Sequence, residues 1–249
     1  MRLSAVILTK NEEKNIRECI KCLSFCDEIL VVDDESEDKT RDIAGGLGAR
    51  VFVRPLDGNF SSQRNYAIGL AQGKWVVFVD PDERVSKELA GEIIRVINDP
   101  AMHYDGFYLK RHDFLWGRCL THGEIGGVRL LRLAKKKAGR WRRRVHEVWD
   151  ILGPTYELNS PLLHYPHQSL EEFLGDINYM STLDARAKDE EGRQASLTRI
   201  IFWPSGKFIY NFVFRLGFLD GLQGFIVALI MSFHSFLSWS KLWKMQEKA

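Results

Sequence analysis

Residues 28–42 read EILVVDDESEDKTRD, and their pattern indicates the class of fold. Its four consecutive apolar residues at 29–32 are typical of a strand that is buried on both faces of a sheet. Asp33 and Asp34 follow directly, and the Ser, Asp and Thr residues after them favour a turn and a helix N-cap. The stretch therefore predicts a buried strand, an acidic loop and then a helix.

The same pattern extends on both sides of this stretch, as far as about residue 111. Three more short apolar segments lie at residues 3–8, 50–53 and 75–79. The longer amphipathic segments between them predict helices that begin near Glu12, Asp38 and Ser61. Strands that alternate with helices in this way predict an α/β fold with a Rossmann-like, mostly parallel sheet.

After Val79 the pattern loosens and takes on α+β character. We expect a helix over 86–97, an aromatic strand over 106–110 and a glycine-rich turn before the VRLLRL segment at 128–133. A polar helical sequence begins shortly after residue 168, and we place a domain boundary there.

The C-terminal extension, 169–249, turns from a polar helix into an apolar, aromatic segment that begins at Ile200. Residues 221–239 contain no Asp, Glu, Lys or Arg, and these nineteen residues reach the lower length limit of a transmembrane helix. Several serines and His234 interrupt the run, so we favour a helical hairpin at the membrane interface, with Lys241 and nearby lysines facing anionic lipid. Burial against the core, a dimer contact and a true membrane span remain open.

Composition excludes several classes of function. The 35 Lys and Arg residues and 33 Asp and Glu residues give a net charge of +2, which argues against a dedicated nucleic-acid-binding protein. With 45% hydrophobic and 27% charged residues, the chain should form a packed fold. Three of its four cysteines lie in one short predicted helix, and this usage fits a reducing compartment. The N-terminal sequence MRLSAVILTKNEE shows no export signal, so we expect a cytoplasmic protein.

Polar loops follow the first, second and fourth predicted strands, at the sheet edge where open α/β folds bind ligands. The first loop, TKNEE at 9–13, contains no glycine, which argues against a dinucleotide-binding turn and against a Walker loop. After the second strand, one of Asp33 and Asp34 can accept hydrogen bonds from a nucleobase or a ribose. After the fourth, Asp80 and Asp82 form a D-x-D pair that suits a divalent cation shared with a diphosphate.

Four segments together resemble the family 2 glycosyltransferases with the GT-A fold. They are T-K-N-E-E at 9–13, V-V-D-D-E-S-E-D-K-T at 31–40, Q-R-N-Y-A at 63–67 and D-P-D-E at 80–83. The later segments are similar to the lipopolysaccharide-core glucosyltransferase branch of that family. The resemblance implies a nucleotide-diphospho-sugar transferase domain over 1–168, with a nucleotide-sugar half at 1–100 and an acceptor half at 101–168.

The resemblance also implies roles for individual residues. The nucleotide sugar would be held by Thr9, Asn11, Glu12, Asp33, Asp34, Arg64 and Asp80. Asp82 would bind Mg²⁺ or Mn²⁺, and a late histidine often completes the metal site in this fold. His164 is the best match by order, with His167 as the alternative and a packing role as the plain interpretation. Glu12 and Arg64 have plain interpretations too, as a helix acid favoured by the dipole and as an ion-pair partner within one helix.

The catalytic base is harder to assign, because the E-D pair usual in the family is missing from the second half of this chain. The segment at the equivalent place is V-H-E, so we choose Glu147, ahead of Glu124 and Asp150. One carboxylate near the acceptor hydroxyl must take its proton as the new bond forms. His146 lacks the second histidine of an H-E-x-x-H zinc site, which excludes a metalloprotease.

A basic segment precedes this candidate base. AKKKAGRWRRR at 134–144 holds seven cations around Trp141, and such a cluster concentrates anions. We expect Arg143, Arg144 and His146 to contact a phosphate or the acceptor, and the segment to hold a phosphorylated acceptor or to face acidic lipid. A solvated loop and RNA binding are the alternatives.

These observations predict a metal-dependent transferase that moves a hexose to a hydroxyl of a glycolipid such as lipopolysaccharide core. The resemblance implies that the hexose is glucose, that the donor is UDP-glucose and that the reaction inverts the anomeric configuration. We expect it on the inner face of the cytoplasmic membrane, with peripheral contact through 200–249 and no nucleic-acid partner; homo-oligomerisation stays open. One alternative is a sugar nucleotidyltransferase, which would need a glycine-rich, basic first loop. The other is a noncatalytic, membrane-peripheral module that binds sugar nucleotides.

Overall fold

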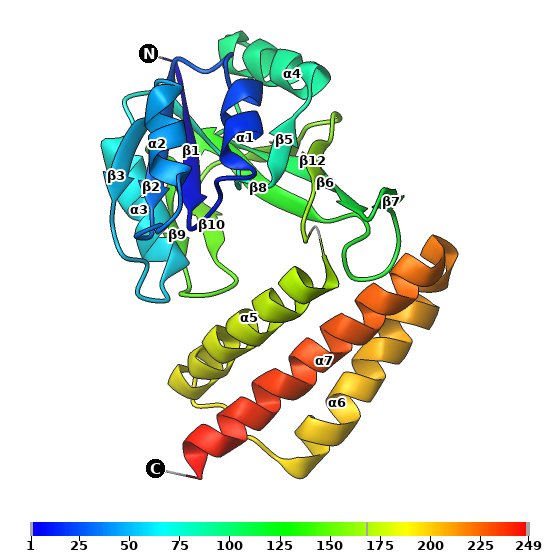
Figure 1. The fold of residues 1–249 in the computed structure, drawn as a ribbon. Helices are drawn as coiled ribbons and strands as arrows, with labels where there is room; N and C mark the ends of the chain where they lie inside the picture. Colours follow the sequence, from blue (N-terminus) through cyan, green and yellow to red (C-terminus); the bar gives the residue numbers. More distant parts are fainter. Residues whose placement is uncertain (1, 168, 248–249) are drawn as a thin grey trace. The chain divides into compact units, whose positions relative to one another are not determined.

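A computed structural model describes residues 2–167 and 169–247 of the chain (Figure 1). Two compact units pack separately. The sheet unit comprises Met1–Arg111 with Arg129–His164, and the helical unit comprises His112–Val128 with Tyr165–Ala249. This division differs from the predicted single boundary after residue 168.

Residues 112–128 belong to the helical unit because Asp220 fixes them there. Its carboxylate accepts hydrogen bonds from the backbone N–H groups of Thr121 and His122, at 3.0 and 2.8 Å. The side-chain amide of Asn211 also donates to Glu124, at 2.8 Å. These contacts join residues about a hundred positions apart, so the sequence pattern alone did not reveal them.

Parallel strands form the first part of the sheet and follow the predicted apolar runs. They are β1 (Leu3–Thr9), β2 (Glu28–Asp33), β3 (Arg50–Val53) and β4 (Trp75–Phe78). Their order across the sheet is β3, β2, β1 and β4, and Ala5 of β1 lies between Ile29 of β2 and Val77 of β4. The loops that follow these strands therefore emerge at one edge of the sheet.

Antiparallel strands extend the sheet beyond β4. Strand β8 (Arg129–Lys135) pairs with β4, and β6 (Gly106–Leu115), which is longer than the predicted strand at 106–110, pairs with β8. The shorter strands of the sheet are β5 (Glu83–Val85), β7 (Arg118–Leu120), β11 (Thr155–Glu157) and β12 (Leu162–His164). A separate hairpin joins β9 (Gly139–Arg142) to β10 (Val148–Ile151).

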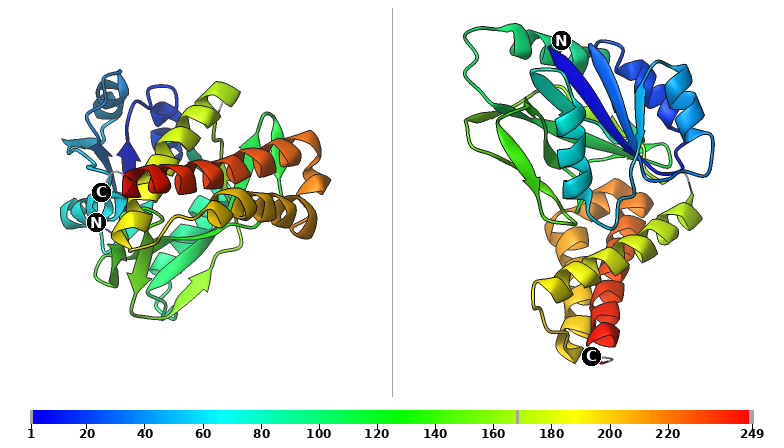
Figure 2. Two further views of the ribbon diagram at one scale, coloured as in Figure 1. Left: turned by 90° about the horizontal axis from the view of Figure 1, so that it is seen from below. Right: turned by 90° about the vertical axis from the view of Figure 1, so that its left-hand side faces the viewer.

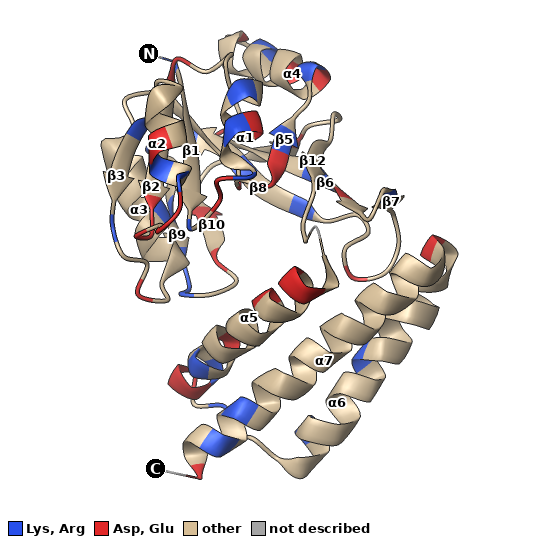
Figure 3. Cartoon of the chain, in the orientation of Figure 1, with Lys and Arg blue, Asp and Glu red and all other residues tan. Residues whose placement is uncertain are grey.

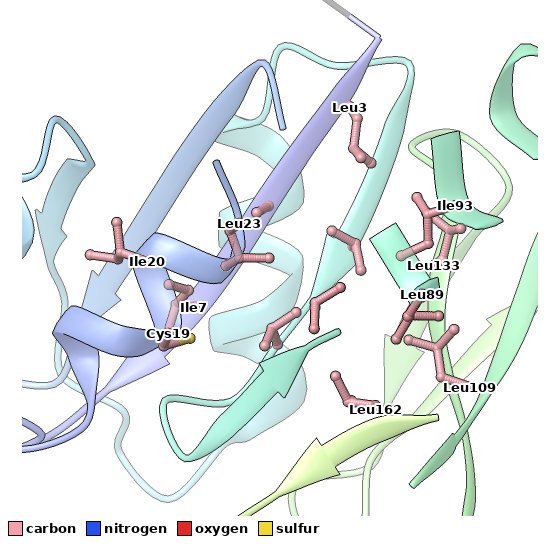
Figure 4. Close-up of a cluster of buried hydrophobic side chains, with 14 of the residues drawn as sticks. Leu3, Ile7, Cys19, Ile20, Leu23, Leu89, Ile93, Leu109, Leu133 and Leu162 are labelled. Carbon is pink, nitrogen blue, oxygen red and sulfur yellow. The ribbon is translucent and has the colours of Figure 1, made fainter. Parts of the chain in front are cut away.

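Helices cover both faces of the sheet, because successive residues of a strand point to opposite sides. The helices are α1 (Ile16–Cys22), α2 (Thr40–Gly46), α3 (Phe60–Leu70) and α4 (Lys87–Asn98). On one face, Ile7 belongs to a core that includes Cys19 of α1 and Leu89 of α4 (Figure 4). On the other, Phe78 belongs to a core that includes Ala67 of α3 and Trp141 of β9.

The first two helices begin later than predicted. Helix α1 begins at Ile16 and not near Glu12, and α2 begins at Thr40. The loops before them bind each other instead: the Asn11 backbone N–H donates to the Ser36 hydroxyl at 2.8 Å, and that of Glu12 donates to the Thr40 hydroxyl at 2.7 Å. These bonds hold the polar loops after β1 and β2 together.

Three α-helices form most of the helical unit over its described residues. They are α5 (Leu170–Glu190), α6 (Leu197–Ile209) and α7 (Gly221–Gln246), with a π-helix (Tyr210–Phe214) and a 3₁₀-helix (Gly217–Asp220) before α7. Helices α5 and α6 both pack on α7, which lies between them (Figures 1 and 2). Ser169 and Ser196 cap α5 and α6 by accepting hydrogen bonds from backbone N–H groups of the first turn.

The segment Gly217–Gln246 is the one helix in the described ranges, 2–167 and 169–247, that is long and apolar enough to cross a membrane. Its most apolar stretch of 18 residues has a mean hydropathy of 1.5, and 44% of that stretch is buried inside the protein. Buried Val227 and Ile230 pack there with Phe173 and Ile177 of α5. Helix α7 therefore serves as the core helix of this unit, and its length and composition alone do not make it a membrane span.

Candidate active site

The loop after β2 is built around the carboxylate of Asp33, which is fully buried. Its oxygens accept hydrogen bonds from the Thr9 hydroxyl at 2.9 Å, from the Ser36 backbone N–H at 2.8 Å and from the Ser36 hydroxyl at 2.5 Å. The Arg41 guanidinium lies 3.7 Å away. Asp33 and Thr9 thus tie the ends of β1 and β2 to the turn before α2.

Asp34 lies at the same edge and bridges three loops. One carboxylate oxygen accepts a hydrogen bond from the Leu56 backbone N–H at 2.8 Å, and the other lies 2.9 Å from Nζ of Lys10. The lysine is largely exposed, whereas the carboxylate is mostly buried. Lys10 is therefore the partner that a ligand at this edge can most easily displace.

Asn11 and Glu12 complete the set of predicted nucleotide-binding residues after β1. The backbone φ of Asn11 is 55°, and its side-chain oxygen accepts a hydrogen bond from the Glu37 backbone N–H at 2.8 Å. The Glu12 carboxylate accepts one from the Asn15 side chain at 2.9 Å. The structure brings these residues to the edge that carries Asp33 and Asp34, and their contact with a nucleotide stays a prediction.

Two arginines meet the carboxylate of Asp80 at the end of β4. Arg132 of β8 contacts Oδ2 and lies 3.3 Å from Oδ1, and Nη2 of Arg64 also lies 3.3 Å from Oδ1. The two arginine side chains are only 7% and 5% exposed. Burial opposes ionisation of Asp80, but the charges of Arg132 and Arg64 outweigh it and hold the pKa of that carboxyl well below its usual range.

Glu83 is the buried neighbour of this cluster. Its Oε2 accepts a hydrogen bond from the Asp80 backbone N–H at 2.8 Å, and its Oε1 lies 3.6 Å from Nη2 of Arg132. Burial raises the pKa of Glu83, and the charge of Arg132 offsets only part of that rise. Burial also opposes the charge of Arg132, but Asp80 and Glu83 overcome it and raise the pKa of the guanidinium, which stays protonated.

Arg64 connects Asp80 to the predicted base, Glu147. Its Nε donates to Oε1 of Glu147 at 2.9 Å while its Nη2 reaches Asp80. The guanidinium lies over the rings of Trp141 and Phe78, 4.7 and 5.1 Å from their centroids. The plain interpretation, an ion pair within α3, is wrong, because both carboxylates come from other parts of the chain, 16 and 83 residues away.

Asp82 and His164, the predicted metal ligands, also meet. Nε2 of His164 lies 3.1 Å from Oδ2 of Asp82, because β12 pairs with β5 and sets His164 opposite Glu83. A carboxylate oxygen and an imidazole nitrogen suit Mn²⁺ and, less well, Mg²⁺. The pair fits two positions of such a cation, and a diphosphate and water would supply the others. Among the described residues, no group of three or more His, Cys, Asp or Glu side chains forms a metal site.

The basic segment forms β9 and the turn that leads to Glu147. Arg143 and His146 adopt left-handed backbone conformations in that turn, with φ of 71° and 55°. The carbonyl of Arg144 accepts a hydrogen bond from the N–H of Phe60 at 3.0 Å, which ties the turn to the start of α3. The turn therefore carries the V-H-E segment beside Arg64, and its contact with a phosphate or the acceptor stays a prediction.

The alternatives for the base and the metal ligand lie in other surroundings. Their partners are Arg142 for Asp150 at 2.6 Å, Lys207 for Glu124 at 2.9 Å and Asp176 for His167 at 3.0 Å. Glu124 and His167 belong to the helical unit, and Asp150 lies on an exposed edge of the β9–β10 hairpin. Within the sheet unit, Glu147 shares Arg64 with Asp80 and His164 contacts Asp82, and their roles as base and metal ligand stay predictions.

The sequence pattern did not indicate a role for Arg132 or Glu83. The signal for Arg132 was a charged residue inside an apolar strand, LLRLA at 130–134, where burial demands an acidic partner. The signal for Glu83 was its position directly after the D-x-D pair. Neither signal names the partner, since Arg132 and Asp80 are 52 residues apart.

Comparison with known proteins identifies the family. Residues 4–145 match the family described as Glycosyl transferase family 2. The chain belongs to this family. The prediction that rested on the four polar segments of the sequence is thereby confirmed.

Two relatives align with almost the whole length of this glycosyltransferase. An uncharacterized glycosyltransferase of Rickettsia typhi is 30% identical over 267 residues, which cover 100% of this chain and 89% of the relative. LpsC of Rhizobium meliloti, named a lipopolysaccharide core biosynthesis glycosyltransferase, is 30% identical over 251 residues, which cover 97% of this chain and 92% of LpsC. The similarity therefore includes the C-terminal helices.

A solved structure shares the fold. TarS 1–349 of S. aureus, crystallised with UDP-GlcNAc, superposes with a TM-score of 0.52 at 16% identity, and the match covers 100% of this chain and 92% of that one. At so low a sequence identity, the similarity supports a shared fold and nothing more. The predicted GT-A fold, with its mixed, mostly parallel sheet, is confirmed.

Proposed function

We propose that this glycosyltransferase transfers a hexose, glucose from UDP-glucose, with inversion to a hydroxyl of a glycolipid acceptor such as lipopolysaccharide core. The observation that carries the proposal is the contact of one guanidinium, that of Arg64, with both Asp80 and Glu147. It joins the D-x-D end of β4 to the predicted base in one site. The name of LpsC supports an acceptor of the lipopolysaccharide-core type.

On the donor side, Asp82 and His164 are the residues that would hold Mg²⁺ or Mn²⁺. When bound, such a cation supplies positive charge for the departing diphosphate. Asp80 keeps Arg64 and Arg132 in place at the same strand end, so that cationic side chains stand near the leaving group. The nucleotide would lie along the polar edge that carries Thr9, Asn11, Glu12, Asp33 and Asp34.

On the acceptor side, Glu147 takes the proton of the attacking hydroxyl. The new glycosidic bond forms as the bond between the sugar and the diphosphate breaks, and the proton ends on the Glu147 carboxylate. The hydrogen bond from Arg64 orients that carboxylate, which is only 17% exposed. Arg143, Arg144 and His146, on the turn before it, would bind phosphate or other acidic groups of the acceptor.

The acceptor class implies a location at the inner face of the cytoplasmic membrane. Peripheral contact through 200–249 is part of the proposal. Large apolar side chains on α6 and α7, among them Phe202, Trp203 and Phe233, are exposed to solvent, which supports such a contact. Association of two copies through the same helices is the competing arrangement.

Release of UDP from UDP-glucose, with Mn²⁺ and lipopolysaccharide core as acceptor, tests the proposal. We expect Asp82→Ala to abolish release, and Glu147→Gln to lower it about 100-fold or more while UDP-glucose still binds. Asp150→Asn, at an exposed carboxylate, is the matched control and should retain activity.

Three results would contradict the proposal in different ways. Full activity in Glu147→Gln would exclude Glu147 as the base. Release of pyrophosphate from a nucleoside triphosphate and a sugar 1-phosphate would identify a nucleotidyltransferase. Binding of UDP-glucose without transfer to any acceptor or to water would identify a noncatalytic module.

A further inference from the structure

The helical unit exposes an aromatic face on α6. Phe202 and Trp203 are 69% and 62% exposed, and Tyr210, directly after the helix, is exposed as well. The opposite face of α6 packs on α7, where Pro204 is buried and its carbonyl accepts a hydrogen bond from the Ser232 hydroxyl. The outward aromatic residues are therefore not needed to hold the helix pair together.

This outward face is hollowed into a groove of about 570 Å³, which we call the α6 groove. Its lining includes Arg199, Phe202, Trp203, Gly206, Lys207 and Tyr210. These positions recur at helical spacing and share one face of α6. A Cβ atom at Gly206 would meet nothing within 4 Å, so the groove is open at its centre. Its volume lies within the roughly 300–1,000 Å³ of small-molecule sites.

Cations lie near both ends of the α6 groove. The Arg199 guanidinium is held over the ring of Trp239, 5.1 Å from its centroid, and Nζ of Lys207 lies 2.9 Å from Oε1 of Glu124. Eight residues separate the two cations, which is about 12 Å along an α-helix. An apolar channel between anchored positive charges is suited to a ligand that has an apolar chain and an anionic head.

Acidic segments are scarce on α6 and α7 (Figure 3). Residues 197–246 contain five Lys or Arg residues and a single acid, Asp220. Asp220 is buried and bound to the backbone of Thr121 and His122, and Glu124 pairs with Lys207, so neither acid compensates the charge of Arg199. A second copy that met this face across a two-fold axis would place cation against cation, which disfavours a dimer as the occupant.

We propose that the α6 groove binds an anionic phospholipid and so docks this glycosyltransferase on a membrane surface. One acyl chain lies along Phe202, Trp203 and Gly206, and the phosphate is held by Arg199 or Lys207. The inference rests on the peripheral membrane contact of the proposed function, which it narrows from the whole segment 200–249 to one groove. Anionic lipid, and not apolar surface alone, is then required for docking.

Sedimentation of the whole chain with vesicles tests this inference. One set of vesicles contains phosphatidylcholine alone, and the other contains phosphatidylcholine mixed with phosphatidylglycerol. We expect binding to the mixed vesicles only, and a loss of about 30-fold in affinity in the Arg199→Gln/Lys207→Gln variant. Phe202→Ser/Trp203→Ser should lose at least about tenfold. Leu152→Ser, at a 93% exposed position of the sheet unit, is the control and should bind unchanged.

Gly206→Leu separates the groove from general adhesion. The added side chain fits sterically and fills the place of the acyl chain, so we expect weaker binding to mixed vesicles although the surface becomes more apolar. Unchanged or stronger binding of this variant would overturn the groove as the site. Equal binding of wild type to both vesicle types would overturn the need for an anionic head.

Two further measurements distinguish lipid binding from dimer formation and from the transfer reaction. Light scattering without vesicles reports the mass of the protein in solution. If wild type is a dimer that the Phe202→Ser/Trp203→Ser substitutions dissociate, and if wild type does not bind vesicles, a second copy covers the groove. Release of UDP from UDP-glucose without vesicles should be the same in wild type and all groove variants. If wild type releases no UDP but binds the mixed vesicles, the proposed reaction fails and the lipid site stands.

Discussion

The ends of β2 and β4 carry similar acidic sequences but satisfy their carboxylates in different ways. After β2, the donors to Asp33 are hydroxyl and backbone N–H groups of Thr9 and Ser36, at the same edge. After β4, the partners of Asp80 are the guanidinium groups of Arg64 and Arg132, which come from α3 and β8. The first arrangement is local and uses neutral donors, and the second is long-range and charged.

A run of acidic residues after a strand can therefore have more than one use. Neutral donors hold the carboxylate of Asp33 in a fixed turn, and its oxygens are too buried to offer much hydrogen-bonding capacity to a ligand. The arginines next to Asp80 can exchange its carboxylate for a phosphate. A carboxylate is planar and a phosphate is tetrahedral, but a guanidinium binds either oxyanion through two N–H groups. The end of β4 is therefore the better place for diphosphate chemistry.

Arg132→Met should have the largest effect, because it removes the buried partner of both Asp80 and Glu83. We expect the free energy of unfolding to fall by about 3–5 kcal/mol, the usual cost of leaving buried charges without a partner. The midpoint of urea unfolding measures it. Arg129→Met, on the same strand but largely exposed, is the control and should change stability by less than about 1 kcal/mol. Equal losses in the two variants would mean that the cluster at β4 does not differ from a surface ion pair.

Arg64→Lys breaks the link between the end of β4 and the predicted base. A lysine can reach Asp80 or Glu147 but cannot bind both with one planar group. We expect kcat for UDP release to fall about 100-fold, with a smaller change in KM for UDP-glucose. Arg95→Lys, on the exposed surface of α4, should leave both constants unchanged. An unchanged kcat in Arg64→Lys would show that the orientation of Glu147 does not matter.

Asp33→Asn tests the other side of the comparison. The amide replaces one charged acceptor with a donor that faces the Thr9 and Ser36 donors, and the fully buried site has no water to compensate. We expect a loss of about 2 kcal/mol in the free energy of unfolding. Asp42→Asn, at an exposed position of α2, should stay within about 0.5 kcal/mol of wild type. A loss of activity without a loss of stability would instead place Asp33 in contact with the nucleotide.

The sequence was sufficient for the local part of this picture. Apolar runs such as 29–32 predicted the parallel strands, because a strand that is buried on both faces needs few polar positions. The acids after those runs had to emerge at the carboxyl edge. Asp82 and His164 were matched by order along the chain, and they meet at 3.1 Å because β12 returns beside β5.

The remainder depended on long-range pairing that no local pattern specifies. Arg132 reaches Asp80 because β8 inserts antiparallel beside β4, with Leu133 opposite Val77. The same limit explains Glu124, which lies between two predicted strands of the acceptor half in sequence but packs in the helical unit through Lys207. A charged residue inside an apolar strand indicates that a partner of opposite charge exists. Only the fold shows which residue that partner is.

The thiols of α1 pack next to the end of β4. Sγ of Cys19 donates to the Asp80 carbonyl at 3.5 Å, and Sγ of Cys22 accepts a hydrogen bond from the Val85 N–H at 3.3 Å. The side-chain hydrogen bond between Cys22 and Cys19 lowers the pKa of Cys22 from 9.0 to about 7, against the opposing effect of burial. Between these two values the folded chain therefore binds fewer protons at Cys22 than the unfolded chain does, so this residue's contribution to stability rises with pH across that window.

Alkylation by iodoacetamide, followed by mass spectrometry, checks that pKa and the contact behind β4 together. We expect Cys22 to react with a midpoint near pH 7, whereas burial raises the pKa of Cys26 and keeps its thiol unreactive there. Cys22→Ser should remove both the labelling and the rise of stability with pH. If Cys22 reacts only near pH 9.0, neither Cys19 nor Val85 forms a hydrogen bond with its sulfur. In that case α1 contacts the end of β4 less closely than the loops after β1 and β2 contact each other.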